Sequence, residues 1–250
     1  MLKTCRFVLV VALSAFVLAA GCSTDKKAEE TEPRTVHHHK AKGTGHAEKA
    51  DHAKKSDHQK KRFTQPEKLA DSWNAPERDE WQRPQAVVDA MNIEAGMTVA
   101  DVGTGTGYFV PYLSEAVGKD GRVFAVDIES AMLDYVDQLS KEKGLENVET
   151  ILSAQTKTNL EPNSTDRVLI VNTWHHIPDR AEYAKHLKSR LTEDGSVWIV
   201  DFTRESPSGP PKKHRLEPEE IVQELEAGGF DAQVHSLKLD RQYMVVGRLN

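Results

Sequence analysis

The chain has 250 residues, enough for one domain of ordinary size together with extensions. From Phe63 onward it carries 20 Lys and Arg against 32 Asp and Glu, so this part is acidic and lacks the basic stripe expected of a nucleic-acid-binding protein. The two cysteines, Cys5 and Cys22, lie near the N-terminus, which excludes disulfides, thiolate zinc sites and cysteine nucleophiles from the rest of the chain.

Residues 1–21 have the features of a secretory signal peptide. Lys3 and Arg6 precede an apolar run over residues 7–20, which is too short to span a bilayer comfortably. Cys22 follows Leu-Ala-Ala-Gly, and this run resembles the lipobox of bacterial lipoproteins. The resemblance implies lipidation of Cys22 and anchoring in the bacterial cell envelope, and Ser23 fits sorting to the outer membrane. Ordinary cleavage nearby is the alternative.

Residues 22–62 contain almost no large apolar side chain, and we expect them to form a disordered tether. The tether carries 11 Lys and Arg against 7 Asp and Glu, a basic balance that would let it lie against anionic lipid headgroups. Six of the 11 histidines occur here. Histidine-rich tracts can bind metal loosely, but a solvated spacer is the preferred interpretation, and no metal site is predicted.

From residue 63 to residue 250 we predict one α/β domain. Trp73 and Trp81 precede Pro84, and they are expected to be packing anchors, with a lid over the ligand site as the alternative. Hydrophobic spacing then predicts strands and helices in alternation. The predicted strands cover 98–102, 121–126, 148–152, 166–171, 196–202, 230–239 and 242–249. The predicted helices cover 87–91, 110–117, 132–144, 179–191 and 217–227.

This alternation indicates a parallel sheet with helices on both faces, whose ligands bind at the carboxyl ends of the strands. Four polar residues fall at such ends: Asp101, Asp127, Asn172 and Asp201. Asp179 and Glu182 have the spacing of a capping box, which would start the helix over 179–191.

The glycine-rich run after the first predicted strand is the best-defined motif. Gly103, Gly105 and Gly107 stand at alternate positions directly after the apolar strand. Glycine permits a tight turn with positive φ and leaves room for a ligand against bare backbone. The helix that follows directs free N–H groups at the same place. The run therefore predicts a site for a nucleoside-bearing cofactor.

The spacing argues against NAD. Its fingerprint is Gly-x-Gly-x-x-Gly, and the third glycine position falls on Tyr108 or Val110 here. Asp127 ends the next predicted strand, twenty residues beyond Gly107. A carboxylate at this place can accept hydrogen bonds from both hydroxyl groups of a ribose.

Residues 101–107, Asp-Val-Gly-Thr-Gly-Thr-Gly, resemble motif I of the class I S-adenosylmethionine-dependent methyltransferases, and Val126-Asp127 resembles the next motif. Residues 166–171 with His175-His176-Ile177 resemble the fourth strand and its loop in ubiquinone/menaquinone-type and "type 11" members. The resemblance covers about residues 82–247. It implies a Rossmann-like methyltransferase fold with a seven-stranded, mostly parallel sheet, in which the last strand lies antiparallel between its neighbours.

The resemblance also implies how S-adenosylmethionine would be held. The three glycines would let the backbone approach the cofactor, and Asp101 would orient their loop. Asp127 would hold the ribose, and Ile128 would pack on the adenine. Many members have an acidic residue against the adenine amine, where this chain has Ala154. Gln155 is the candidate substitute.

For the methyl acceptor, the family implies positioning and, where needed, removal of a proton. His175 and His176 are the candidate bases, because histidine titrates near neutrality. Packing within the loop is the alternative for each. Tyr108, Asn172 and Trp81 are candidates for substrate binding. The predicted function is methyl transfer to a small molecule. The alternative is an envelope-anchored, non-catalytic ligand-binding protein on a degenerate methyltransferase fold.

Overall fold

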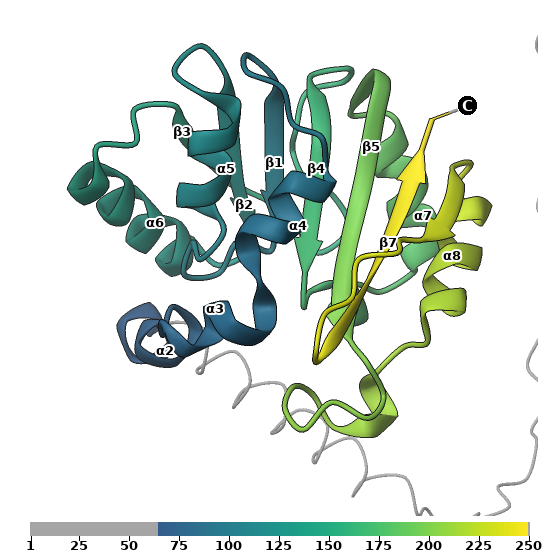
Figure 1. The fold of residues 1–250 in the computed structure, drawn as a ribbon. Helices are drawn as coiled ribbons and strands as arrows, with labels where there is room; N and C mark the ends of the chain where they lie inside the picture. The colour runs from purple at the N-terminus through teal and green to yellow at the C-terminus, as the bar shows by residue number, and fades with distance from the viewer. Residues whose placement is uncertain (1–64, 250) are drawn as a thin grey trace, which may run out of the picture. The chain divides into compact units, whose positions relative to one another are not determined.

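The computed structural model describes residues 65–249 (Figure 1). The predicted signal peptide, the lipidation of Cys22 and the predicted tether lie outside the described residues. Within residues 65–249, no helix is both long enough and apolar enough to cross a membrane.

The described part of the chain is built on one seven-stranded sheet with the order β3-β2-β1-β4-β5-β7-β6. The strands are β1 (Thr98–Val102), β2 (Arg122–Asp127), β3 (Val148–Leu152), β4 (Thr165–Val171), β5 (Leu191–Phe202), β6 (Asp231–Val234) and β7 (Gln242–Arg248). Neighbours among β1 to β5 pair in parallel, and β7 is antiparallel to both β5 and β6. The predicted fold, with its inserted antiparallel strand, is confirmed.

Helices cover both faces of the sheet (Figure 1). They are α2 (Pro66–Trp73), α3 (Glu77–Gln82), α4 (Pro84–Ala90), α5 (Val110–Val117), α6 (Ser130–Lys143), α7 (Arg180–Lys188) and α8 (Pro218–Ala227), with two short 3-10 turns, η1 (Trp174–His176) and η2 (Lys212–His214). Buried side chains of α4 and α5 pack on one face, where α6 also contacts β2, and those of α7 and α8 pack on the other.

Strand β4 is almost continuously apolar because helices cover it on both faces. Val168 and Ile170 contribute to the core under α7 and α8, whereas Leu169 and Val171 contribute to the core under α4 and α5. A strand covered on both sides needs apolar residues at every position. Burying each such side chain stabilises the fold by about 1.5–3 kcal/mol.

The structure differs from the prediction in several places, and β5 begins at Leu191, where the predicted helix over 179–191 was expected to end. Residues 66–82, for which no element was predicted, form α2 and α3. The strand predicted over 230–239 shortens to β6. The predicted capping box is wrong, because Asp179 has a φ of +48° and makes no cap hydrogen bond. A capping box stands instead at the start of α8, where the N–H of Glu217 donates to Glu220 at 2.7 Å.

Candidate active site

The glycine-rich loop lies at the carboxyl ends of β1 and β2. Gly103, Gly105 and Gly107 have φ angles of +76°, +54° and +72°, which favour glycine. The surroundings of Gly103 and Gly105 also leave little room for a side chain. A Cβ atom on Gly103 would stand 2.3 Å from the Oγ1 atom of Thr173, and one on Gly105 would stand 3.2 Å from the ring of Trp73. The loop therefore needs glycine both for its backbone angles and for close approach.

Asp127 connects this loop to the end of β2. Its Oδ2 atom accepts a hydrogen bond from the N–H of Gly105 at 2.9 Å, and its Oδ1 atom accepts one from the N–H of Glu129 at 3.0 Å. Burial raises the pKa of the Asp127 carboxyl. Because a carboxylate has about four acceptor sites, Asp127 keeps acceptor capacity that suits the hydroxyl groups of a ribose.

Two exposed apolar side chains stand beside Asp127. Ile128 is 52% exposed and Leu152 is 54% exposed, at the ends of the paired strands β2 and β3. Val234 is the only other large apolar residue that is exposed among residues 65–249. Such a pair can cover a flat apolar ring, as the predicted adenine contact of Ile128 requires. Leu152 was not predicted, because its exposure leaves no pattern in the sequence. Gln155 lies nearby on an exposed turn between Ala154 and Lys157.

Asp101 is buried at the end of β1, below the same loop. Its Oδ2 atom accepts a hydrogen bond from the Thr104 hydroxyl at 2.8 Å. Burial raises the pKa of Asp101 to about 7, despite the lowering effect of that hydrogen bond, and the nearby charge of Asp127 adds to the rise. The loop thus rests on a buried carboxyl group whose pKa is raised toward neutrality.

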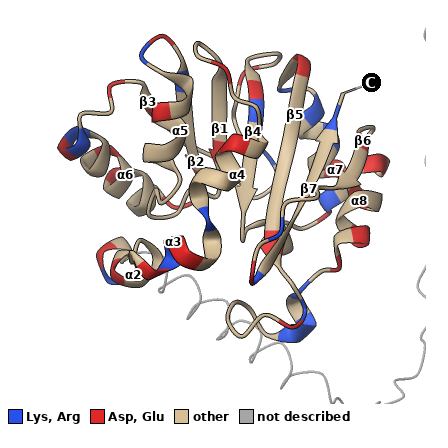
Figure 2. Ribbon diagram, in the orientation of Figure 1, with Lys and Arg blue, Asp and Glu red and all other residues tan. Residues whose placement is uncertain are grey.

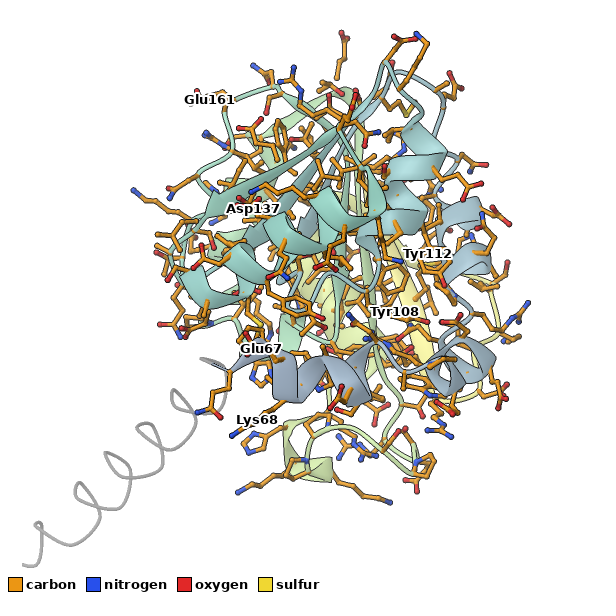
Figure 3. All side chains as sticks on the ribbon, turned by 90° about the vertical axis from the view of Figure 1, so that its left-hand side faces the viewer. Glu67, Lys68, Tyr108, Tyr112, Asp137 and Glu161 are labelled. Atoms are coloured by element: carbon orange, nitrogen blue, oxygen red, sulfur yellow. The ribbon has the colours of Figure 1, made fainter. Side chains whose placement is uncertain are left out.

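The segment that contains α2 and α3, residues 66–82, lies on the glycine-rich loop, and we call it the N-terminal cap. The Nδ2 atom of Asn74 donates to the carbonyl of Thr106 at 3.0 Å, and the Thr106 hydroxyl donates back to Asn74 Oδ1 at 2.7 Å. The hydroxyl groups of Tyr108 and Tyr112, labelled in Figure 3, both donate to Asp79. The cap is therefore attached to this edge by polar side chains as well as by buried apolar residues of α2, Leu69 and Ala70.

The three predicted substrate-binding residues lie at the same edge of the sheet. The Tyr108 ring is covered by the guanidinium of Arg78, whose carbon lies 3.8 Å from the ring centroid. The Trp81 ring lies 6.0 Å from the ring of Phe202 and 5.0 Å from the guanidinium of Arg241. Asn172 follows β4 with a φ of +55°.

His175 and Asp201 form a buried pair at the ends of β4 and β5. The Nδ1 atom of His175 lies 2.8 and 3.0 Å from the two carboxylate oxygens of Asp201, and the side chains are 3% and 2% exposed. Because a carboxylate only accepts, Nδ1 carries a proton, so Nε2 is the nitrogen of this ring that can act as an acceptor. The sequence placed each residue at a strand end but did not pair them.

His176 stands next to this pair, with its ring centroid 4.1 Å from that of His175. Burial lowers the pKa of His176, His175 and His214 lower it further, and Asp201 partly offsets the effect. The two predicted histidines thus have different environments: the His175 ring is held by a carboxylate, whereas His176 is exposed and has a lowered pKa.

The segment after β5 lies at the same end of the sheet as the cap (Figure 1). Arg215 is buried there and donates to the backbone carbonyls of Arg204, Ser206, Ser208 and Pro210 at 2.7 to 3.1 Å. Basic residues gather on η2, in the same segment (Figure 2). One arginine thus fixes the path of a proline- and glycine-containing loop. Within residues 65–249, no group of three or more His, Cys, Asp or Glu side chains is placed to hold a metal ion.

The chain is similar to known proteins in both sequence and structure. Residues 93–244 match a family model described as a methyltransferase domain. A crystal structure of a SAM-dependent methyltransferase from Aquifex aeolicus is 29% identical, with a TM-score of 0.68, and the similarity covers 75% of this chain and 98% of that one.

Curated relatives match over shorter stretches. A protein-L-isoaspartate O-methyltransferase of Methanococcus maripaludis strain C5 is 32% identical over 90 residues, which are 36% of this chain and 42% of that protein. A demethylmenaquinone methyltransferase of Geobacillus stearothermophilus is 32% identical over 113 residues, which are 45% of this chain and 48% of that protein. The chain therefore spans less than half the length of these two relatives.

Proposed function

Because the chain belongs to the family of methyltransferase-domain proteins, with S-adenosylmethionine as its cofactor, we propose that it methylates an oxygen or nitrogen atom of a small-molecule acceptor. When bound, the cofactor supplies a methyl group that its positively charged sulfur has already activated. The observation that supports the proposal is the His175–Asp201 pair, which stands at the same edge of the sheet as the glycine-rich loop.

The residues of this edge fit the cofactor. The oxygens of Asp127 have free acceptor capacity for a ribose, and Ile128 with Leu152 offers an apolar surface beside it. The glycine-rich loop approaches this place without side chains of its own at positions 103, 105 and 107. These residues bind and orient, and they supply no proton transfer.

His175 is the proposed base. Its Nε2 atom has no hydrogen-bond partner among residues 65–249 and is available to take a proton from a hydroxyl or amine of the acceptor. Asp201 holds the Nδ1 proton and stabilises the imidazolium that forms. A positioned base of this kind contributes about 100- to 10,000-fold to the rate. The burial of the pair limits the access of bulk water to it.

Two measurements test the proposal in sequence. Calorimetry with S-adenosylhomocysteine should show binding to the folded protein, weakened at least about tenfold in Asp127→Asn, which loses the charge of the ribose acceptor. Methyl transfer from radiolabelled cofactor to a small-molecule extract should then give a labelled product. His175→Gln should reduce its rate by about 100-fold without changing cofactor affinity.

The outcomes separate the alternatives. A folded protein that does not bind S-adenosylhomocysteine would refute the proposal. Binding without transfer to any extract would favour a non-catalytic ligand-binding protein. An undiminished rate of methyl transfer in His175→Gln would show that His175 is not the base, but it would not contradict the proposed methyltransferase activity.

We also propose that Cys22 is lipidated and anchors the protein in a bacterial envelope. The support is the sequence of residues 1–22 and the low-complexity stretch that follows. Cys22→Ala should leave the precursor unprocessed or move the protein to the soluble fraction. An unchanged mass and unchanged membrane fractionation of that variant would contradict the proposal.

A further inference from the structure

A buried row of polar side chains runs from the N-terminal cap to the end of β4. Arg78 donates from Nε and Nη2 to Gln82 Oε1, at 3.4 and 3.1 Å. Gln82 donates from Nε2 to Gln242 Oε1 at 2.5 Å, and Gln242 donates from Nε2 to Asn172 Oδ1 at 2.6 Å. Gln82 is 0% exposed and Gln242 is 2% exposed. Three segments far apart in the sequence thus meet in one hydrogen-bonded row.

The row has only one direction in which every link is satisfied. A guanidinium donates and never accepts, so the oxygen of Gln82 must face Arg78. The NH2 group of Gln82 then faces Gln242, whose oxygen must receive it, and the same reasoning continues to Asn172. The orientation of an amide must be assigned from its hydrogen bonds, and here the arginine assigns all three. Reversing the row would leave two donors facing each other in a buried place.

The last group of the row, the Asn172 amide, lies at the end of β4, beside the candidate active site. The Nδ2 atom of Asn172 has no hydrogen-bond partner among residues 65–249. It is also not fully buried, because Ser140 Oγ is the only fully buried side-chain nitrogen or oxygen atom without a partner in that part of the chain. Thr173, the next residue, lies against Gly103 of the glycine-rich loop, and His175 follows two residues later.

We propose that Arg78, Gln82 and Gln242 are positioning residues that fix Asn172 as a hydrogen-bond donor to the methyl acceptor. The acceptor would then carry a carbonyl, carboxylate or phenolate oxygen next to the atom that is methylated. A donor at this place favours an acceptor that has lost its proton to His175, because it stabilises the resulting negative charge. The inference rests on the proposed function, which supplies the role of the site.

The most direct test is a substitution at Gln82 that reverses the orientation of the Gln242 and Asn172 amides. In Gln82→Glu, the new carboxylate accepts from both Arg78 and Gln242, so Gln242 turns its oxygen toward Asn172. Asn172 must then donate from Nδ2 into the protein and present its oxygen to the site. Glutamate has nearly the shape of glutamine, and Arg78 compensates the added charge. Gln233→Glu, at an exposed position on β6, is the matched control for charge.

The direct readout is NMR of protein labelled with 15N-asparagine, in which Asn172→Asp identifies the side-chain signal by its loss. In the unsubstituted protein, the Asn172 NH2 protons should exchange with water freely. In Gln82→Glu, at least one should be protected by about tenfold or more, as for an amide that gains a hydrogen bond. Equal exchange in the two folded proteins, or protection already present without the substitution, would overturn the inference.

Activity gives a second, separable readout. With a labelled product in hand, Gln82→Glu should lower kcat/KM for the acceptor by about 10- to 100-fold. The affinity for S-adenosylhomocysteine should stay within about twofold, and Gln233→Glu should match the unsubstituted protein. Full activity in a variant whose Asn172 has reversed would refute the donor role. Failure of the unsubstituted protein to methylate anything would count against the proposed function, whereas the NMR result would still decide the orientation of Asn172.

Discussion

Asp101 should make the fold less stable as the pH rises. Its pKa is raised from an ordinary 3.8 to about 7 in the folded state, mainly by burial. Between these values the folded protein holds a proton that the unfolded chain has lost, so the stability of the folded state falls as pH increases through this range. The rise in the pKa of Asp101 from 3.8 to about 7 corresponds to at most about 4 kcal/mol of stability, lost in full above pH 7.

Asp101→Asn should abolish this decrease in stability with rising pH. The amide oxygen can still accept the hydrogen bond from Thr104, and no charge has to be buried. Near pH 4 the variant and the unsubstituted protein should have similar free energies of unfolding. At pH 8 the variant should be more stable by up to about 4 kcal/mol. Urea unfolding, followed by tryptophan fluorescence at about pH 4.5, 6 and 8, measures the difference in free energy of unfolding between the two proteins.

The prediction concerns the difference in free energy of unfolding between the two proteins, because other groups also titrate. Burial lowers the pKa of His176 and raises that of Asp127, and both groups are present in the two proteins. The contribution of His176 largely cancels in the comparison, and that of Asp127 changes only through its interaction with Asp101. A stability difference that does not grow with pH, or a variant that is less stable at pH 8, would refute the assignment of a raised pKa to Asp101.

Three further predictions concern the site. Gly103→Ala should destabilise the protein by about 2–4 kcal/mol in urea unfolding, because it adds a clash to a positive φ, whereas Gly144→Ala, with positive φ and open space, should cost about 1 kcal/mol. Ile128→Ser should weaken S-adenosylhomocysteine binding several-fold in calorimetry with little change in stability, and Val234→Ser, at an exposed apolar position elsewhere, should leave binding unchanged. Asp201→Asn should lower the rate of methyl transfer by at least about 100-fold with cofactor affinity unchanged, and an equal loss of both would indicate misfolding instead.

The fold could be predicted because its central strands, such as β4, are nearly continuous apolar runs separated by helical segments. The glycine-rich loop and Asp127 were also accessible, since a cofactor loop and its ribose acceptor have a fixed spacing along the chain. Residues 66–82 were not predicted to be helical. They are rich in charged residues, and their helices depend on contacts such as that between Asp79 and Tyr108, which are distant in sequence.

The same limit applies to the catalytic side of the site. His175 and Asp201 are separated by 26 residues, and Gln82 and Gln242 by 160. No periodicity or short motif links residues at such separations, because only the folded sheet brings them together. Asn172 could be placed at a strand end from sequence, but the direction of its amide depends on three side chains from other elements.

The N-terminal cap has a consequence for the timing of cofactor exchange. Side-chain hydrogen bonds such as those between Asn74 and Thr106 hold it on the glycine-rich loop, and water can replace hydrogen bonds of this kind. Segments attached in this way open at a lower free energy than the core. If S-adenosylmethionine reaches the loop only when the cap has lifted, its association rate will level off at the opening rate as its concentration increases. A stopped-flow rate that stays linear in cofactor concentration would show that the loop is reached without that movement.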